Sequence, residues 1–155
     1  MTLWFKLFHI ASVVAFLGNI TTGLFWHAHA ARTRDPKILA HTMDGIIRSD
    51  RYFTNPGAVG ILVFGLASAI HQGFPILRTG WIFWAIVLFA ISGILFATRV
   101  VPLQRQLRAL ASAGAESGSF DFGAYHALAR RWETWGAVAL FAPLGAFCLM
   151  VLKPL

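Results

Sequence analysis

The sequence has few charged residues and almost no cysteine. Charged residues make up 12% of its 155 residues, and Cys148 is the one cysteine. Soluble domains carry roughly 25% charged residues, so this composition excludes an ordinary soluble domain. A single cysteine cannot form an intrachain disulfide, so cysteine usage does not indicate a redox compartment. The sequence also lacks a nucleophile with a partner base, paired carboxylates and a phosphate-binding glycine loop, and it therefore offers no motif of an enzyme.

Hydrophobic residues account for 57% of the chain and gather in four long runs. These runs cover about residues 3–26, 52–70, 80–101 and 132–152. Between Lys6 and Arg32 the first run contains no acid, lysine or arginine. Each run is long enough to cross a hydrocarbon core of roughly 30 Å as a helix. We therefore predict an all-α fold, in which residues 1–155 form one polytopic membrane domain with an antiparallel bundle of four transmembrane helices.

The distribution of lysine and arginine predicts how the helices are threaded. Ten of these 13 residues lie in the segments around the connections from the first run to the second and from the third to the fourth. Positive charge concentrates on the cytoplasmic side, so we expect both segments inside and both termini outside a bacterial inner membrane. The six tryptophans fall at the ends of the runs, where their rings prefer the headgroup region. Contact with anionic lipid headgroups then explains the net charge of +7, without a nucleic-acid partner.

The segments on the cytoplasmic side have helical patterns of their own. Asp35-Pro36 is a helix-start signal, and apolar residues follow it at helical spacing, which predicts a short amphipathic helix on the membrane or on the bundle. The third run keeps its helical period beyond Pro102, which is expected to kink it. Asp121 is expected to cap a helix that leads into the fourth run. Two helices are thus predicted to project into the cytoplasm.

Small residues predict where the helices pack closely, because membrane helices associate through small side chains and polar contacts. The second run is rich in glycine and alanine, the third has Ala90, Gly93 and Ala97 at helical spacing, and the first has Gly18. The alternative is that these glycines let a flat cofactor lie against the backbone. Asn19 in the first run is predicted to form hydrogen bonds between helices.

Two histidines on the predicted outer side are candidate cofactor ligands. His9 lies inside the outer end of the first run, and His71 closes the second run on the same side. Facing each other across neighbouring helices, two neutral imidazoles can hold the iron of haem b. The alternative is that both are interfacial histidines bonded to water, headgroups or the backbone.

Four further histidines fall on the predicted inner side. They are His27, His29, His41 and His126. Together they can form a metal-ligand set or a group that handles protons. The alternative is that they are interfacial histidines in basic segments. The rings of His27 and His29 point to different faces of one helix, so this pair does not form a metal motif on its own.

Several stretches resemble a known family. They are KLFHIASVVAFLGNITTGLFW, RSDRYFTNPGAV, VVPLQRQLRAL, RRWETWG and LMVLKP. In this order they resemble a bacterial membrane family, the domain-of-unknown-function family 2269, over nearly the whole chain, and the resemblance implies a small integral membrane protein. More loosely, His9 and Gly18 are similar to the first helix of the copper-linked CopD group and the haem-associated HemJ group, which implies a haem or metal role for His9.

The sequence leads to three hypotheses of function. The first is a non-enzymatic structural or accessory subunit of a membrane assembly, either a homo-oligomer or a larger complex. The second is a b-type haem protein of redox or tetrapyrrole chemistry, with His9 and His71 as the ligand pair. The third is metal handling by the histidines of the inner side.

Overall fold

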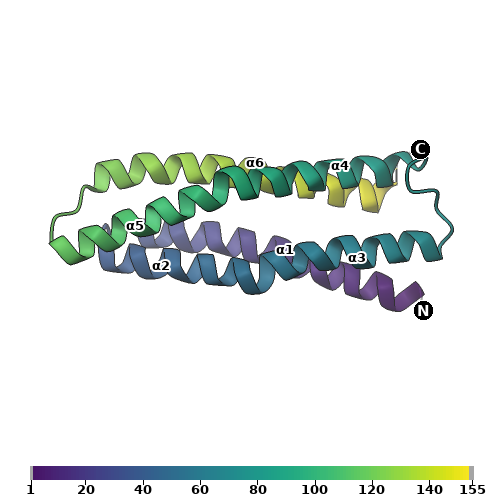
Figure 1. Ribbon diagram of the computed structural model, residues 1–155, viewed down its shortest axis with the longest axis horizontal. Coiled ribbons are helices and arrows are strands. Elements are labelled where there is room, and N and C mark those ends of the chain that lie inside the picture. Colours follow the sequence, from purple (N-terminus) through teal and green to yellow (C-terminus); the bar gives the residue numbers. More distant parts are fainter. Residues whose placement is uncertain (1, 154–155) are drawn as a thin grey trace.

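The computed structural model describes residues 2–153, and they contain helices and no strand. The elements are α1 (Thr2–Ala31), α2 (Pro36–Ser49), the π-helical turn η1 (Asp50–Thr54), α3 (Asn55–His71), α4 (Gly80–Leu95), the π-helical turn η2 (Phe96–Val100), α5 (Val101–Ser117) and α6 (Phe122–Leu152). Because α2 continues through η1 into α3, and α4 through η2 into α5, the elements form four long helices (Figure 1). All four are long and apolar enough to cross a membrane, so the predicted all-α polytopic bundle is confirmed.

The two ends of the bundle differ in the chain ends and connections that they contain. Both ends of the described chain and the connection at residues 72–79 lie at one end, whereas the α1–α2 and α5–α6 connections lie at the other (Figure 1). We call the first half, residues 2–18, 57–93 and 138–153, the terminal half. The other half, residues 19–56 and 94–137, is the basic half, because most lysine and arginine residues belong to it.

The helices are longer than a bilayer is thick. The helix from Pro36 to His71 has 36 residues and that from Gly80 to Ser117 has 38. At 1.5 Å per residue they measure about 54 and 57 Å, against about 30 Å of hydrocarbon. Several turns therefore extend beyond the hydrocarbon, and the charges identify the basic half as the projecting part. Asp121 caps α6 as expected, because its Oδ1 accepts the Ala124 N–H at 3.0 Å.

The amphipathic helix predicted between the first two spans is α2, and it lies on the bundle. Its apolar face packs against α5, with Leu39 and Met43 fully buried. Asp35 caps it by accepting the Lys37 N–H at 2.8 Å. The structure differs from the expectation in one respect, since α2 is not a separate helix but the continuation of α3 through η1.

Both π-helical turns stand immediately before a proline. The Asn55 N–H donates to the Asp50 carbonyl, and the Val101 N–H donates to the Phe96 carbonyl, each five residues back. The next residues are Pro56 and Pro102. Proline has no N–H and its ring clashes with the carbonyl four residues earlier, so a widened turn lets each helix continue without a break. At Pro102, where we expected a kink, the structure has this widened turn.

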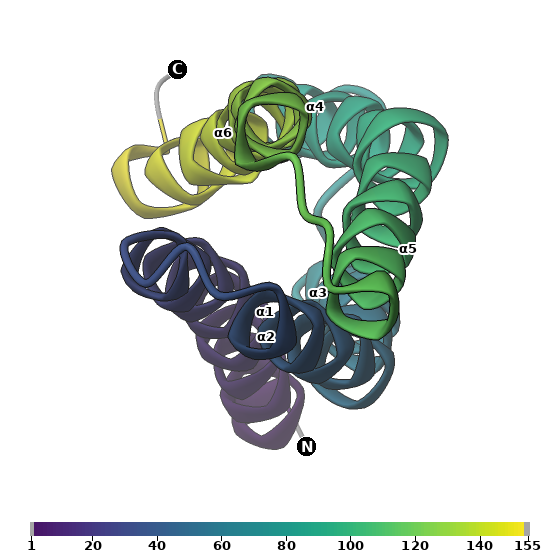
Figure 2. The same ribbon diagram turned by 90° about the vertical axis from the view of Figure 1, so that its left-hand side faces the viewer.

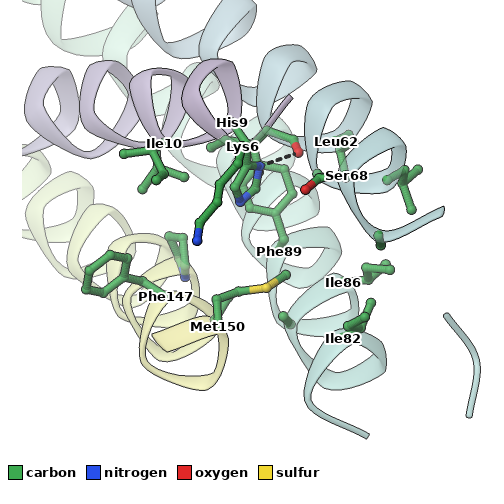
Figure 3. A pocket seen from close by; sticks show the side chains of 18 of the residues that line it. Lys6, His9, Ile10, Leu62, Ser68, Ile82, Ile86, Phe89, Phe147 and Met150 are labelled. Carbon is green, nitrogen blue, oxygen red and sulfur yellow. Dashed lines mark hydrogen bonds between the residues drawn. The ribbon is translucent and has the colours of Figure 1, made fainter. Parts of the chain in front are cut away.

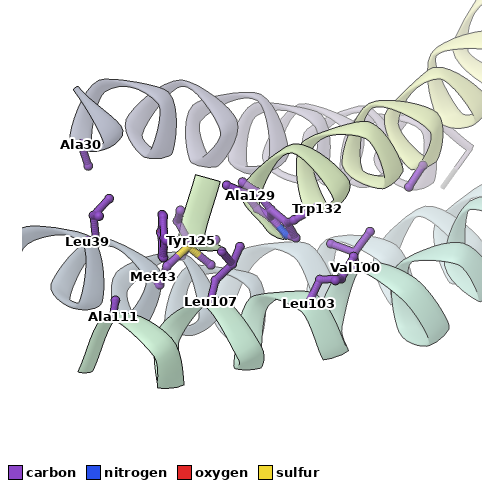
Figure 4. Close-up of a cluster of buried hydrophobic side chains, with 12 residues drawn as sticks. Ala30, Leu39, Met43, Val100, Leu103, Leu107, Ala111, Tyr125, Ala129 and Trp132 are labelled. Carbon is purple, nitrogen blue, oxygen red and sulfur yellow. The ribbon is translucent and has the colours of Figure 1, made fainter. Parts of the chain in front are cut away.

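The basic half contains the main hydrophobic core (Figure 4). Leu39, Met43, Leu107 and Tyr125 are among its fully buried side chains. They come from α2, α5 and α6, and the smaller Ala30 adds α1. In the view from the basic end, these helices surround a common central axis (Figure 2). The projecting half is thus packed in the manner of a soluble helix bundle.

The terminal half consists of two helix pairs. The α1–α3 pair is close, because a Cβ on Gly57 would lie 3.1 Å from the Phe16 Cβ and a Cβ on Gly60 would clash with Ser12. The α4–α6 pair is tied by the Ser92 hydroxyl, which donates to the Ala139 carbonyl at 2.6 Å. Among the residues described, the backbone of α3 does not come close to that of α4 or α6. The two pairs therefore leave space between them.

Candidate functional site

A cavity of about 430 Å³ lies between the two helix pairs in the terminal half (Figure 3). Sites for small organic ligands measure about 300–1,000 Å³. All four membrane helices contribute to its wall, which is mainly aliphatic and aromatic. Its few polar side chains are Lys6, His9, Ser68, Gln72 and Lys153. The cavity thus has the composition of a site for an apolar ligand with a polar end.

His9 is the one histidine in the wall of this cavity. Its Nδ1 lies 3.0 Å from the Ile61 carbonyl oxygen of α3. Because a carbonyl can only accept, Nδ1 carries the proton, and Nε2 keeps its lone pair. Within residues 2–153 no group forms a hydrogen bond with Nε2. The half-buried imidazole therefore presents a free lone pair in a defined orientation, which is the state of a metal-ligating histidine.

The glycine at position 65 makes room for this ring. A Cβ on Gly65 would lie 3.0 Å from both Cε1 and Nδ1 of His9. That separation is too short for ordinary van der Waals contact, so any larger side chain would displace the imidazole. Gly65 thus allows close packing of α1 against α3, which is the first of the two roles predicted for the glycines of the second run. The alternative role, with a flat cofactor against the backbone, stays a prediction.

Two cations stand at the rim of the cavity, near the two ends of the described chain. Lys6 comes from the first turns of α1, and Lys153 directly follows the end of α6. The Lys153 amino group lies 5.5 Å above the centre of the Trp81 ring, which holds it at the rim. Figure 3 shows the Lys6 side chain extending beside His9 into the space between the helix pairs. An acidic group on a bound ligand would meet complementary charge here.

His71 is placed apart from this cavity. It is exposed at the end of α3, where its ring packs edge-on against Phe5 at a centroid distance of 5.3 Å. It does not belong to the cavity wall. The structure therefore does not bring His9 and His71 together as two ligands facing one space, because His9 meets α3 at Gly65, six residues before His71.

Asn19 lies in a polar network where the two halves meet. Its amide donates to Asp50 Oδ1 at 3.0 Å and to the Thr54 hydroxyl at 2.9 Å. Thr54 donates to Asp50 Oδ1 at 2.7 Å, and Gln104 donates to Asp50 Oδ2 at 2.8 Å. The network joins α1, η1 and α5, as predicted for Asn19, but the residue at its centre, Asp50, was not predicted. A cavity of about 240 Å³ adjoins it.

The histidines of the basic half are not gathered into one site. His27 is fully buried, with Nε2 3.1 Å from the Tyr125 hydroxyl and Nδ1 3.2 Å from Glu133 Oε1. His29, His41 and His126 are exposed. In the described part of the chain, no three His, Cys, Asp or Glu side chains are placed to hold a metal ion. The buried His27 thus links α1 to α6, and the predicted four-histidine set is not assembled.

Gly18 and Gly93, which the sequence marked for helix packing, face open space. A Cβ on either residue would meet nothing within 4 Å in the described structure. Gly93 borders the opening between α4 and α3. Close helix packing is found instead at Gly57 and Gly60 of α3.

Fold and site together define a four-helix integral membrane protein with an apolar cavity between its two helix pairs. The chain belongs to a family described as predicted integral membrane protein (DUF2269), whose model matches residues 3–154. This match confirms the resemblance to this family, whereas the looser similarity to the CopD and HemJ groups stays a prediction. No curated protein and no solved structure matches the chain.

Proposed function

We propose that the protein binds haem b in the cavity of the terminal half, with His9 as an axial ligand of the iron. The proposal is carried by one observation, the free Nε2 of an oriented, half-buried imidazole in the wall of an apolar cavity. Helix bundles hold such cofactors between facing helices, and imidazole is a common axial ligand of haem.

The residues around the cavity fit a porphyrin. Its ring is flat and apolar, and the space between the two helix pairs has aliphatic and aromatic walls. Its two carboxylates lie on one edge, and Lys6 and Lys153 offer positive charge at one rim. The Ile61 carbonyl fixes the orientation of His9. When bound, haem b supplies one-electron chemistry.

The test is an absorption spectrum of the protein purified in mild detergent, oxidised and then reduced with dithionite, with and without added haemin. We expect a Soret band and a sharp α band on reduction. His9→Ala should lose most of both bands. His71→Ala is the matched control and should keep them, because His71 is exposed outside the cavity. A folded wild-type protein with a featureless visible spectrum after haemin addition would overturn the proposal.

The second candidate function, a structural or accessory subunit, is favoured by the opening between α3 and α4. These helices follow each other in the chain, yet their backbones do not approach in the described residues, and Gly93 borders the gap. A helix of a partner or of a second copy can enter there. Gly93→Leu should then abolish a stoichiometric complex in mild detergent, whereas Gly18→Leu should not. A monomer without partner in the wild type would contradict this role.

We also infer that the basic half projects into the cytoplasm of a bacterium, near anionic lipid headgroups, and that the termini face outward. The support is the concentration of lysine and arginine in that half. In a Cys148→Ser background, Ser119→Cys in the α5–α6 connection should resist a membrane-impermeant thiol reagent in intact cells. Leu77→Cys, exposed in the opposite connection, should react. The reverse pattern would invert the orientation.

A further inference from the structure

We propose that Met150 of α6 is the second axial ligand, with its thioether sulfur on the opposite side of the haem from His9. This inference rests on the proposed haem site. Two axial ligands must approach the iron from opposite faces of the ring. His9 belongs to the α1–α3 pair, so the second ligand has to come from the α4–α6 pair across the cavity.

Few side chains of the α4–α6 wall carry an atom that can bind iron. The wall is formed by aliphatic and aromatic side chains apart from Met150 and, at the rim, Lys153. The Lys153 amino group is held over the Trp81 ring at 5.5 Å, and a cation there suits a carboxylate better than a metal. The thioether of Met150 is the remaining donor, and thioethers are established axial ligands of haem iron.

The position of Met150 agrees with this role. It is half-buried in the cavity wall. Figure 3 shows its side chain extending from α6 into the space that His9 faces from α1. Cys148, the other sulfur-bearing residue nearby, is two residues earlier, which is about 200° around the helix. It is exposed and is not part of the wall.

The chain offers a matched control for Met150. Met43 is fully buried in the core of the basic half, away from the cavity. Both residues can be changed to leucine, which has nearly the same volume and is tolerated well in apolar surroundings. The Met43→Leu variant then reports any general effect of losing a methionine.

The experiment uses purified full-length protein loaded with haemin. In the ferric wild type we expect the weak red charge-transfer band of thioether-bound iron. Met150→Leu should lose this band, lower the midpoint potential and let carbon monoxide bind the ferrous form readily. Met150→His should keep six-coordinate iron but also lose the band and lower the potential, because an imidazole replaces the thioether. Met43→Leu should match the wild type.

The outcomes separate this inference from the proposed function. A wild type that binds haem, with a ferric spectrum and midpoint potential that Met150→Leu leaves unchanged, overturns the role of Met150 and leaves the haem site standing. A wild type that takes up no haem overturns both. If Met150→Leu fails to fold, the Met150→His variant and the spectrum of the wild type still test the role of Met150. Absence of the charge-transfer band in the haem-loaded wild type contradicts thioether ligation.

Discussion

The two halves of this bundle are built from the same four helices but packed in opposite ways. In the basic half, α2 and α5 close the bundle around a core with fully buried Leu39, Met43 and Leu107. In the terminal half the helices stand as two pairs, with a cavity of about 430 Å³ between them. A hydrogen-bond network around the carboxylate of Asp50 lies where the two halves meet.

The difference follows from the surroundings of each half. Where the helices project into water, apolar side chains gain free energy by leaving it, so the basic half closes on a core. In hydrocarbon that driving force is absent, and helices associate only where small residues or polar groups allow it. The terminal half can therefore keep a cavity without a large loss of stability. The core of the basic half fixes the positions of the helices, and the cavity of the terminal half stays available for a ligand.

Removing a core side chain from the basic half should have the largest effect on stability. Leu107 is 0% exposed, so Leu107→Ala leaves a void and should lower the free energy of unfolding by about 2–5 kcal/mol. Leu66, 36% exposed, borders the cavity of the terminal half, and Leu66→Ala should cost about 0.5 kcal/mol. Reversible unfolding in mixed micelles measures both. Equal losses would show that the two halves are not packed differently.

The junction should show the next largest effect. Asp50 is 7% exposed and accepts hydrogen bonds from Asn19, Thr54 and Gln104. Asp50→Ala leaves these donors without their acceptor and should cost about 1–3 kcal/mol. A double-mutant cycle with Gln104→Leu checks the cause, because the second change should cost much less once Asp50 is absent. Strict additivity would mean that the Asp50–Gln104 contact does not stabilise the junction.

A change at Gly65 tests ligand binding in the terminal half, not the stability of that half. The Cβ of Gly65→Ala would displace the His9 ring from the Ile61 carbonyl, at a cost of about 1 kcal/mol in an otherwise open site. Haem retention after dialysis should fall clearly. Gly18→Ala is the control, because its Cβ meets open space and should leave retention unchanged. If both variants retain haem equally, the fixed orientation of His9 is not required for binding.

The sequence predicted the fold well because the physical signals of membrane helices are strong and local. Four apolar runs and the helical period after Pro36 were sufficient for the four spans and for α2. The continuity of α2 with α3 was not predictable, because Pro56 marks a helix boundary in the sequence. A π-helical turn removes that boundary, and nothing in the residue pattern announces it.

The site was predictable only in part. His9 stands out as a polar residue in an apolar run, but its partners depend on how the two helix pairs separate, which is a tertiary property. Met150 gives no signal, since a methionine in an apolar run is ordinary. Asp50 lies between Arg48 and Arg51 and has the pattern of a solvated segment. One signal was available, because Asp50 follows the buried Ile46 by four residues and so shares its helix face.

The smallest effect is expected at Asp44, six residues before Asp50 in the same continuous helix. Asp44 pairs with Arg48 at 3.1 Å and with Arg108 of α5 at 3.2 Å, yet all three side chains are solvated. Exposed ion pairs contribute about 0.2–1 kcal/mol, so Asp44→Ala should cost no more than that at low salt. The loss should vanish near 1 M salt, where charges are screened within about 3 Å. The loss in Asp50→Ala should persist there, because its buried hydrogen bonds are shielded from ions. A loss of stability in Asp44→Ala that does not depend on salt would mean that these ion pairs, too, belong to the packed core. The solvated Asp44 and the buried Asp50 would then not differ along their common helix.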